Sequence, residues 1–362
     1  MKKYHGILFI LFPGWIFCQP APRQIYEVKE DSLSLNLELV YNQSGYPDYY
    51  RADIFTPVCK SGECLPVRII IHWDLLGNYS HYEMPTGEIL TKNDHAAFTE
   101  EDYQKLNVIL HNSGSLLRDF DLSLLYYSLN ESVESIDGIT GATPKEINQS
   151  IVVGAFFTCH TLWHIVHGEV TGVIRESTRG LESQTLLRYL LSHEKFDYRH
   201  YAIDRIAESG EGMEWAEILC SKIGEGNVFI DRHILQVLPV SWLEDPSVQQ
   251  KVWGHYIPLS HENRMLLANR YKNVRAENVV AKLLPVLAEE ENQQLQGQLY
   301  TVFLNSKLSS GEKEVIIEQY LKGQNHAIDL VLLNIFEEFF QNNRRMQKLI
   351  SKKRGGLKSD RE

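Results

Sequence analysis

Thr143 combines a reactive hydroxyl with a well-marked helix start. Gly141 precedes it, Pro144 fits the first helical position, and Glu146 completes a Thr-x-x-Glu capping box. We expect the helix to run from Ile147 to Gly168, because its apolar residues recur at helical spacing. A phosphate ester on Thr143 would be stabilised by the free backbone N–H groups and the dipole of the helix. The alternative is that Thr143 only caps the helix.

Three histidines of the same predicted helix offer a second chemistry. His160, His164 and His167 are spaced i, i+4 and i+7, so they share one helix face. Two histidines at i, i+4 can chelate zinc or another transition metal. No His-Glu-x-x-His pattern and no Cys-x-x-Cys-His motif accompanies them. Metal binding and a polar helix face therefore both stay open.

The residues before this helix resemble a known cofactor-attachment motif. Residues 137–143, Asp-Gly-Ile-Thr-Gly-Ala-Thr, look like the flavinylation motif of the FMN-binding domain family, with matches at Asp137, Gly138, Thr140, Gly141, Ala142 and Thr143. The resemblance covers about residues 45–170. It implies an FMN esterified through its phosphate to Thr143 by a flavin transferase that uses FAD and magnesium. The chain departs from the family at Lys145, where a second Ser or Thr is common.

In such a domain the isoalloxazine ring carries the electrons, and the fold sets its exposure and potential. The aromatic candidates to pack on the ring are Trp73, Tyr79, Phe156, Phe157 and Trp163. His72, Asp74 and Asn78 flank a predicted turn and could line a pocket. Core packing and solvated loops explain the same residues, and both interpretations stay open.

The first half of the chain reads as an α+β domain over residues 25–172, with a mostly antiparallel sheet. Leucines alternate with polar residues from Leu33 to Leu39, which predicts a half-buried strand. Further strands are expected at Arg51–Val58, Val67–Trp73 and Tyr79–Met84, with a turn at Gly77-Asn78. Thr99 and three acidic residues then predict a helix that ends near Asn112.

The second half, residues 176–342, reads as an all-α region. Paired amphipathic helices start near residues 181, 213, 248, 276 and 312, which is the spacing of stacked helical hairpins. We interpret it as a HEAT-like helical-repeat domain. Residues 343–362 lose the apolar stripe and are predicted to form a flexible basic tail, which leaves a peripheral membrane contact open.

The N-terminus and the cysteines both indicate export. Lys2 and Lys3 precede an uncharged run from Gly6 to Phe17, which predicts a signal peptide over residues 1–18. Phe17 disfavours a lipid anchor on the following cysteine. Cys59 and Cys64 flank a short predicted hairpin loop, where an oxidising compartment would join them by a disulfide. We expect a periplasmic or extracellular location.

Composition excludes some partners. The 362 residues carry a formal net charge of -11, which repels phosphate backbones and disfavours nucleic acid as a general partner. No later segment is long and apolar enough to predict a transmembrane helix. No P-loop, nucleophile elbow or dinucleotide fingerprint is present, so hydrolase, NTPase and Rossmann interpretations have no support. The resemblance to the FMN-binding domain family implies an electron-transfer protein rather than a stand-alone enzyme.

Three hypotheses from different classes follow. The first is an exported flavoprotein electron carrier, with FMN on Thr143 and a helical-repeat region that docks a redox partner. The second is a non-enzymatic scaffold whose α-solenoid binds a protein, with Thr143 as a helix cap. The third is a metal-binding protein that uses His160, His164 and His167.

Overall fold

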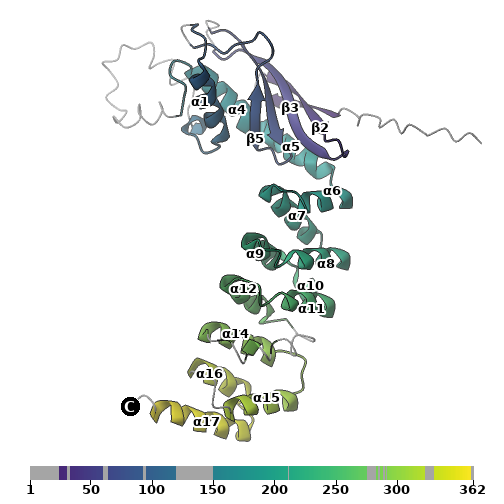
Figure 1. Ribbon diagram of the computed structural model, residues 1–362, viewed down its shortest axis with the longest axis vertical. Helices are drawn as coiled ribbons and strands as arrows, with labels where there is room; N and C mark the ends of the chain where they lie inside the picture. The colour runs from purple at the N-terminus through teal and green to yellow at the C-terminus, as the bar shows by residue number, and fades with distance from the viewer. Residues whose placement is uncertain are drawn as a thin grey trace, which may run out of the picture. The chain divides into compact units, whose positions relative to one another are not determined.

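The chain folds into two units, Met1–Glu182 and Ser183–Glu362. A computed structural model describes residues 24–30, 33–59, 64–92, 95–119, 150–210, 212–274, 283, 286–287, 290, 292–322 and 330–359. The first unit holds an antiparallel sheet with helices, and the described part of the second is helical (Figure 1). This element order confirms the predicted fold class, α+β followed by all-α.

The sheet of the first unit has five antiparallel strands in chain order. They are β1 (Gln24–Glu30), β2 (Leu33–Tyr41), β3 (Pro47–Thr56), β4 (Val67–Asp74) and β5 (Tyr79–Glu83). The turn between β4 and β5 uses Gly77 at a φ of +80°, a conformation that glycine adopts without strain. The patterns of the sequence predict β2 to β5 closely, because successive side chains of a strand point to opposite faces of the sheet.

The two faces of the sheet differ in chemistry. The inner face is apolar, and its buried residues include Leu37, Tyr50, Ile54, Ile71 and Trp73. The outer face carries polar side chains from the intervening positions, among them Arg51, Asp53 and His72. The sheet is therefore covered on one side and presents charged groups on the other.

Helices α1 (Glu100–His111), α4 (Phe156–His167) and α5 (Glu169–Gly180), with the short η1 (Leu116–Asp119), complete the described part of this unit. Thr99 and Asp102 form a capping box at the predicted start of α1. The indole N–H of Trp73 donates to the carbonyl of Val166 at 2.9 Å, and Thr178 Oγ1 donates to the carbonyl of Leu75 at 2.7 Å. These two bonds connect α4 and α5 to β4 and the turn that follows it.

The prediction of one helix from Ile147 to Gly168 is wrong at its start. Residues 150–155 are not helical, and α4 begins at Phe156 with Ala155 as its N-cap. Gly154 takes a φ of +80° inside this stretch, which interrupts a right-handed helix. Thr143 is therefore not the N-cap of the helix that carries the three histidines. The predicted end at Gly168 is correct.

A further helix, α5, follows Gly168 at once and extends the first unit to Glu182 rather than to 172. The sequence hides it, because Gly172 and Thr171 lower its helix propensity. Its buried residues Val170, Ile174 and Thr178 recur at four-residue spacing, so packing rather than propensity stabilises the helix.

The second unit stacks short helices in pairs, which confirms a repeat-like helical region. Its first elements are α6 (Gln184–Leu191), α7 (Phe196–Ser209), α8 (Met213–Lys222), α9 (Val228–Val237), α10 (Val240–Leu243), α11 (Pro246–Gly254) and α12 (His261–Tyr271). The rest are α14 (Gln293–Leu304), α15 (Ser310–Lys322), α16 (Leu330–Phe339) and α17 (Arg344–Ser359). Helices α7, α9, α12, α14 and α16 pack on one another in succession (Figure 1).

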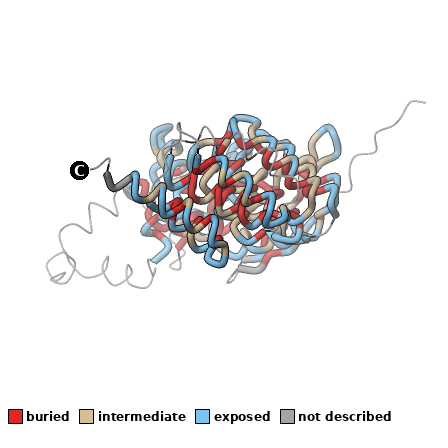
Figure 2. Tube along the Cα trace, turned by 90° about the horizontal axis from the view of Figure 1, so that it is seen from below, coloured by how far each residue is buried: buried red, intermediate tan, exposed pale blue. Residues whose placement is uncertain are grey.

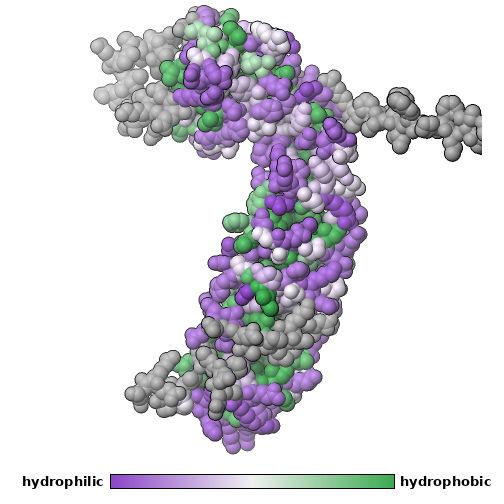
Figure 3. Space-filling view, viewed as in Figure 1, coloured by the Kyte–Doolittle hydropathy of each residue, from purple (hydrophilic) through white to green (hydrophobic). Residues whose placement is uncertain are grey.

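Buried and exposed positions interleave along these helices, as amphipathic packing requires (Figure 2). On the face that Figure 3 presents, hydrophobic side chains form separate patches among hydrophilic ones. In the residues that the structure describes, no helix combines the length and apolar character needed to cross a membrane.

The predicted flexible basic tail is wrong for residues 344–359, which form α17. Met346 and Ile350 are fully buried on this helix. Arg345 and Arg354 form ion pairs with Glu318 and Glu337 of neighbouring helices. These two buried apolar residues anchor an otherwise basic helix, although Gly355 and Gly356 lower its helix propensity.

Candidate functional site

The residues of the flavinylation motif lie outside the described part of the chain. The motif residues all fall within the segment 120–149: Asp137, Gly138, Thr140, Gly141, Ala142 and Thr143. The predicted signal peptide also lies outside the described residues, within 1–23. The structure therefore leaves their roles as predictions. It does describe the chain on either side of the motif.

Both flanks of the motif segment are fixed to helix α4. On the N-terminal side, His164 of α4 lies with its Nε2 3.0 Å from the carbonyl oxygen of Leu117 in η1. On the C-terminal side, Val152 is fully buried and its N–H donates to Cys159 Sγ at 3.3 Å. The segment 120–149 thus leaves and re-enters the described structure beside the same helix.

A cavity of about 450 Å³ lies in this region, and we call it the Trp163 pocket. Its lining comes from the β4–β5 turn, α1, η1, α4 and α5. Two aromatic residues, two arginines and three histidines contribute: Tyr79, Trp163, Arg118, Arg175, His111, His164 and His167. None of the described lining residues is acidic, so the pocket favours an anionic ligand.

Hydrogen bonds hold the aromatic walls of the pocket in place. The indole N–H of Trp163 donates to the carbonyl of Asn112 at 2.9 Å, and the Tyr79 hydroxyl donates to Asn107 Oδ1 at 2.8 Å. Burial raises the pKa of Tyr79, which keeps its phenol neutral. The ring of His111 meets Tyr79 edge-on, with 4.7 Å between centroids. The walls are therefore preorganised rather than loose.

The basic side chains of the pocket differ in how far their existing contacts leave them available to a ligand. His167 lies with its Nε2 2.9 Å from the carbonyl oxygen of Leu110, and burial lowers its pKa, which favours the neutral ring. Arg175 donates from Nε to the carbonyl of Leu76 at 3.0 Å, which leaves the rest of its guanidinium for a ligand. Arg118 pairs with Asp119 at 3.2 Å, and its side chain is 65% exposed. The two arginines supply the permanent positive charge of the pocket.

The structure separates the other predicted pocket residues. Trp163, Tyr79 and Asn78 line the Trp163 pocket, whereas Phe156, Phe157 and Trp73 are buried in the core. Asp74 accepts from the backbone N–H groups of Leu76 and Asn78 and so shapes the β4–β5 turn. His72 lies on the outer face of the sheet, where it is neither part of the pocket lining nor beside the buried aromatic residues.

The three histidines of α4 do share one helix face, as predicted, and the rings of His160 and His164 are 4.2 Å apart. However, the Nε2 atoms of His164 and His167 face backbone carbonyl oxygens, which accept from the protonated nitrogen. Among the described residues, the set of three side chains that could hold a metal is a different one: His72, His81 and Glu83. The contacts of the α4 histidines favour a structural role.

The expected disulfide is absent from the structure. Cys59 and Cys64 are both thiols, and the backbone N–H of Cys64 donates to Cys59 Sγ at 3.0 Å. β3 ends at Thr56 and β4 begins at Val67, so neither cysteine sits on a strand that would set it opposite the other. Cys159 and Cys220 are buried as predicted, and burial raises their thiol pKa to about 11 and about 12.

Sequence reasoning missed most of the basic pocket residues. Arg118, His111 and Arg175 come from three separate elements, and no local spacing connects them. His81 and Glu83 were also missed, although a usable pattern existed. They are two residues apart on a strand that pairs with His72 across a short turn, which places all three on one face.

Comparisons of the chain with family models, with curated proteins and with solved structures find no match.

Proposed function

We propose that the protein is an exported flavoprotein electron carrier, with FMN esterified to Thr143 and its ring in the Trp163 pocket. The observation that carries the proposal is the place of this pocket. It lies beside α4, to which both flanks of the segment that contains the motif are fixed. A basic, aromatic cavity therefore lies beside the helix that holds both flanks of the segment with the motif.

The pocket fits the group in size and chemistry. Its volume of about 450 Å³ is within the range of small-molecule sites. Trp163 and Tyr79, which are 3% and 8% exposed, contribute aromatic atoms to the pocket wall. Arg118 and Arg175 offer charge to a phosphate or to the pyrimidine edge of the ring. When bound, FMN would supply reversible electron transfer, and the chain's own residues would bind and orient it and tune its potential.

Maturation and partners follow from the same proposal. A flavin transferase that uses FAD and magnesium would attach the FMN. A redox partner protein would exchange electrons with it, and the helical repeats would dock that partner. Export to the periplasm or beyond would follow from the N-terminal segment, with a lipid anchor less favoured.

The test is the intact mass of the full chain after co-expression with a flavin transferase. The wild type should gain the mass of one FMN and become yellow, and Thr143→Ala should abolish both. Thr143→Ser is the matched control, because it keeps a hydroxyl that the motif accepts. An unmodified wild type, in cells where the transferase labels a known substrate, would contradict the proposal.

The second candidate is a protein-binding scaffold, and the exposed aromatic residues of the second unit favour it. Phe196 of α7 is 38% exposed and Phe229 of α9 is 69% exposed, with ring centroids 6.5 Å apart. Exposed aromatic pairs on a helical repeat are typical of contact surfaces. The mass experiment separates the two candidates, since the scaffold needs no flavin.

A further inference from the structure

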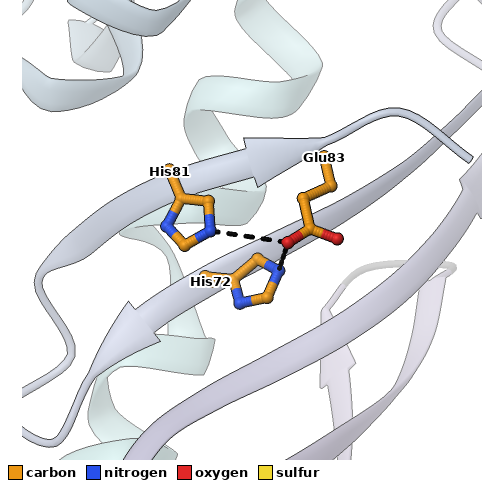
Figure 4. Close-up of side chains that lie close together, drawn as sticks. All are labelled: His72, His81 and Glu83. Atoms are coloured by element: carbon orange, nitrogen blue, oxygen red, sulfur yellow. Dashed lines mark ion pairs between the residues drawn. The ribbon is translucent and has the colours of Figure 1, made fainter.

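The outer face of the sheet brings together two histidines and a glutamate that no motif predicted. His72 of β4 pairs directly with His81 of β5, and Glu83 pairs with the neighbouring Ile70. All three side chains therefore project from the same face (Figure 4). Trp73, the residue after His72, points the other way and donates to α4. The cluster and the Trp163 pocket therefore lie on opposite sides of β4.

The spacing of the three groups matches the coordination of a small cation. Glu83 Oε1 lies 3.5 Å from His72 Nε2 and 3.7 Å from His81 Nε2. One ligand atom from each residue lies within 4.8 Å of both others. Zinc bonds to nitrogen and oxygen are about 2.0–2.1 Å long, so neighbouring ligands in a tetrahedral site are about 3.3 Å apart. The stacked rings of His72 and His81, with an interplanar angle of 13°, would have to rotate so that both Nε2 lone pairs point at one ion.

His72 is a buried polar group that the surrounding protein does not satisfy. It is only 3% exposed, and neither of its ring nitrogens has a hydrogen-bond partner. Tyr49 covers the ring at 5.2 Å, and His81 stacks on it at 4.2 Å with an interplanar angle of 13°. Buried polar atoms nearly always have a hydrogen-bond partner. His72 Nε2 has an ion-pair contact with Glu83 at 3.5 Å but no hydrogen bond, so a cation between the two groups would satisfy it.

The groups around the cluster suit a ligating histidine. His81 Nδ1 lies 3.2 Å from Ser80 Oγ, so its other nitrogen has a partner of the kind that orients a ligating histidine. The nearest cation across the strand, Arg51, is paired with Glu38 at 2.9 Å, which reduces its repulsion of a metal ion.

We propose that His72, His81 and Glu83 form a Zn²⁺ site. Two imidazoles and one carboxylate suit zinc and its transition-metal neighbours rather than calcium or magnesium, which prefer oxygen ligands. Three protein ligands leave a fourth position open, as in zinc sites that bind water or a substrate group. The side chains of His81 and Glu83 are 52% and 56% exposed, so this position faces solvent.

The test is zinc binding by the untagged full-length protein after removal of metal with a chelator. Titration with Zn²⁺ against a chromophoric chelator should give one ion per chain, and zinc should raise the thermal midpoint of unfolding. His81→Ala and Glu83→Gln should each weaken binding by more than about 100-fold, because even changes behind the ligands cost 10–100-fold. Both residues are exposed, so the variants should fold.

His261→Ala is the matched control, since His261 is an exposed histidine of α12. It should bind zinc as the wild type does. The proposal is overturned if the wild type binds no zinc, or if His81→Ala and Glu83→Gln bind as tightly as the wild type. It is also overturned if His164→Ala alone removes the ion, because the metal would then lie on α4.

Discussion

Trp73 donates its indole N–H to the carbonyl oxygen of Val166, with 2.9 Å between the two heavy atoms. Val166 lies in the last turn of α4, where backbone carbonyls have no partner within the helix. The bond satisfies one of them and fixes β4 to the helix that carries Trp163. Because His72 precedes Trp73, the same strand presents His72 on one face and contacts helix α4, which lines the Trp163 pocket, on the other.

Replacing Trp73 by Phe should destabilise the first unit by about 1–3 kcal/mol, the cost of a buried carbonyl without a donor. Chemical denaturation followed by circular dichroism measures the change. Phe55→Leu, at a 64% exposed position on the outer face, should stay within about 0.5 kcal/mol of the wild type. Equal effects of the two substitutions would show that the bond to Val166 contributes no specific stability.

Local patterns predicted the elements that local interactions define. Alternating leucines identify β2, and Thr99 with Asp102 identifies the start of α1 through a capping box. The helical pairs are visible in the sequence because each buries one apolar stripe. In contrast, α5 and α17 depend on a few buried residues against unfavourable glycines, and only the packed structure shows that those contacts prevail.

The candidate sites were harder to predict than the fold, for a related reason. The Trp163 pocket unites Tyr79, Arg118 and Arg175, which are far apart in the chain and share no periodicity. The cluster of His72, His81 and Glu83 depends on the register of two strands, with His72 opposite His81. Register follows from the turn and the buried face together, so the cluster becomes visible in the sequence only when the two strands are aligned across their turn.

Charge in the Trp163 pocket should tune the proposed flavin. Arg175→Gln removes a cation that would stabilise the negative charge of the reduced ring, so the reduction potential should fall. A fall of about 30 mV corresponds to about 1.4 kcal/mol for a two-electron couple. Potentiometric titration of the flavinylated protein measures it. Arg188→Gln, at an arginine of α6 paired with Glu214, is the control and should leave the potential unchanged. An unchanged potential in Arg175→Gln would place the ring elsewhere.

Acid should weaken the first turn of α1 through Asp102. A hydrogen bond from Lys92, followed by those from Thr99, holds the pKa of Asp102 below its ordinary value. A carboxyl with a lowered pKa in the folded state stabilises that state above its unfolded pKa of about 3.9, and this contribution disappears as the pH falls through the folded pKa. Asp102→Asn should therefore lower the thermal midpoint at pH 7 and reduce the loss of stability between about pH 5 and pH 2. Glu101→Gln, in the same turn, should keep the acid dependence of the wild type. Identical pH profiles for Asp102→Asn and the wild type would refute the role of the Lys92 contact.

Helix α17 should be an integral part of the second unit. Ile350 is fully buried in it, and replacing a buried isoleucine by alanine costs about 2–5 kcal/mol. In a helical stack each element contacts mainly its neighbours, so the loss should appear first in α15 and α16, against which α17 packs. Hydrogen exchange read by mass spectrometry should show faster exchange in these helices for Ile350→Ala, with α7 and α9 unchanged. Truncation after Ser359 is the matched control and should leave the exchange of α15 and α16 as in the wild type. If Ile350→Ala exchanges like the wild type throughout, residues 344–359 contribute nothing to the stack and behave as the basic tail that the sequence alone predicts.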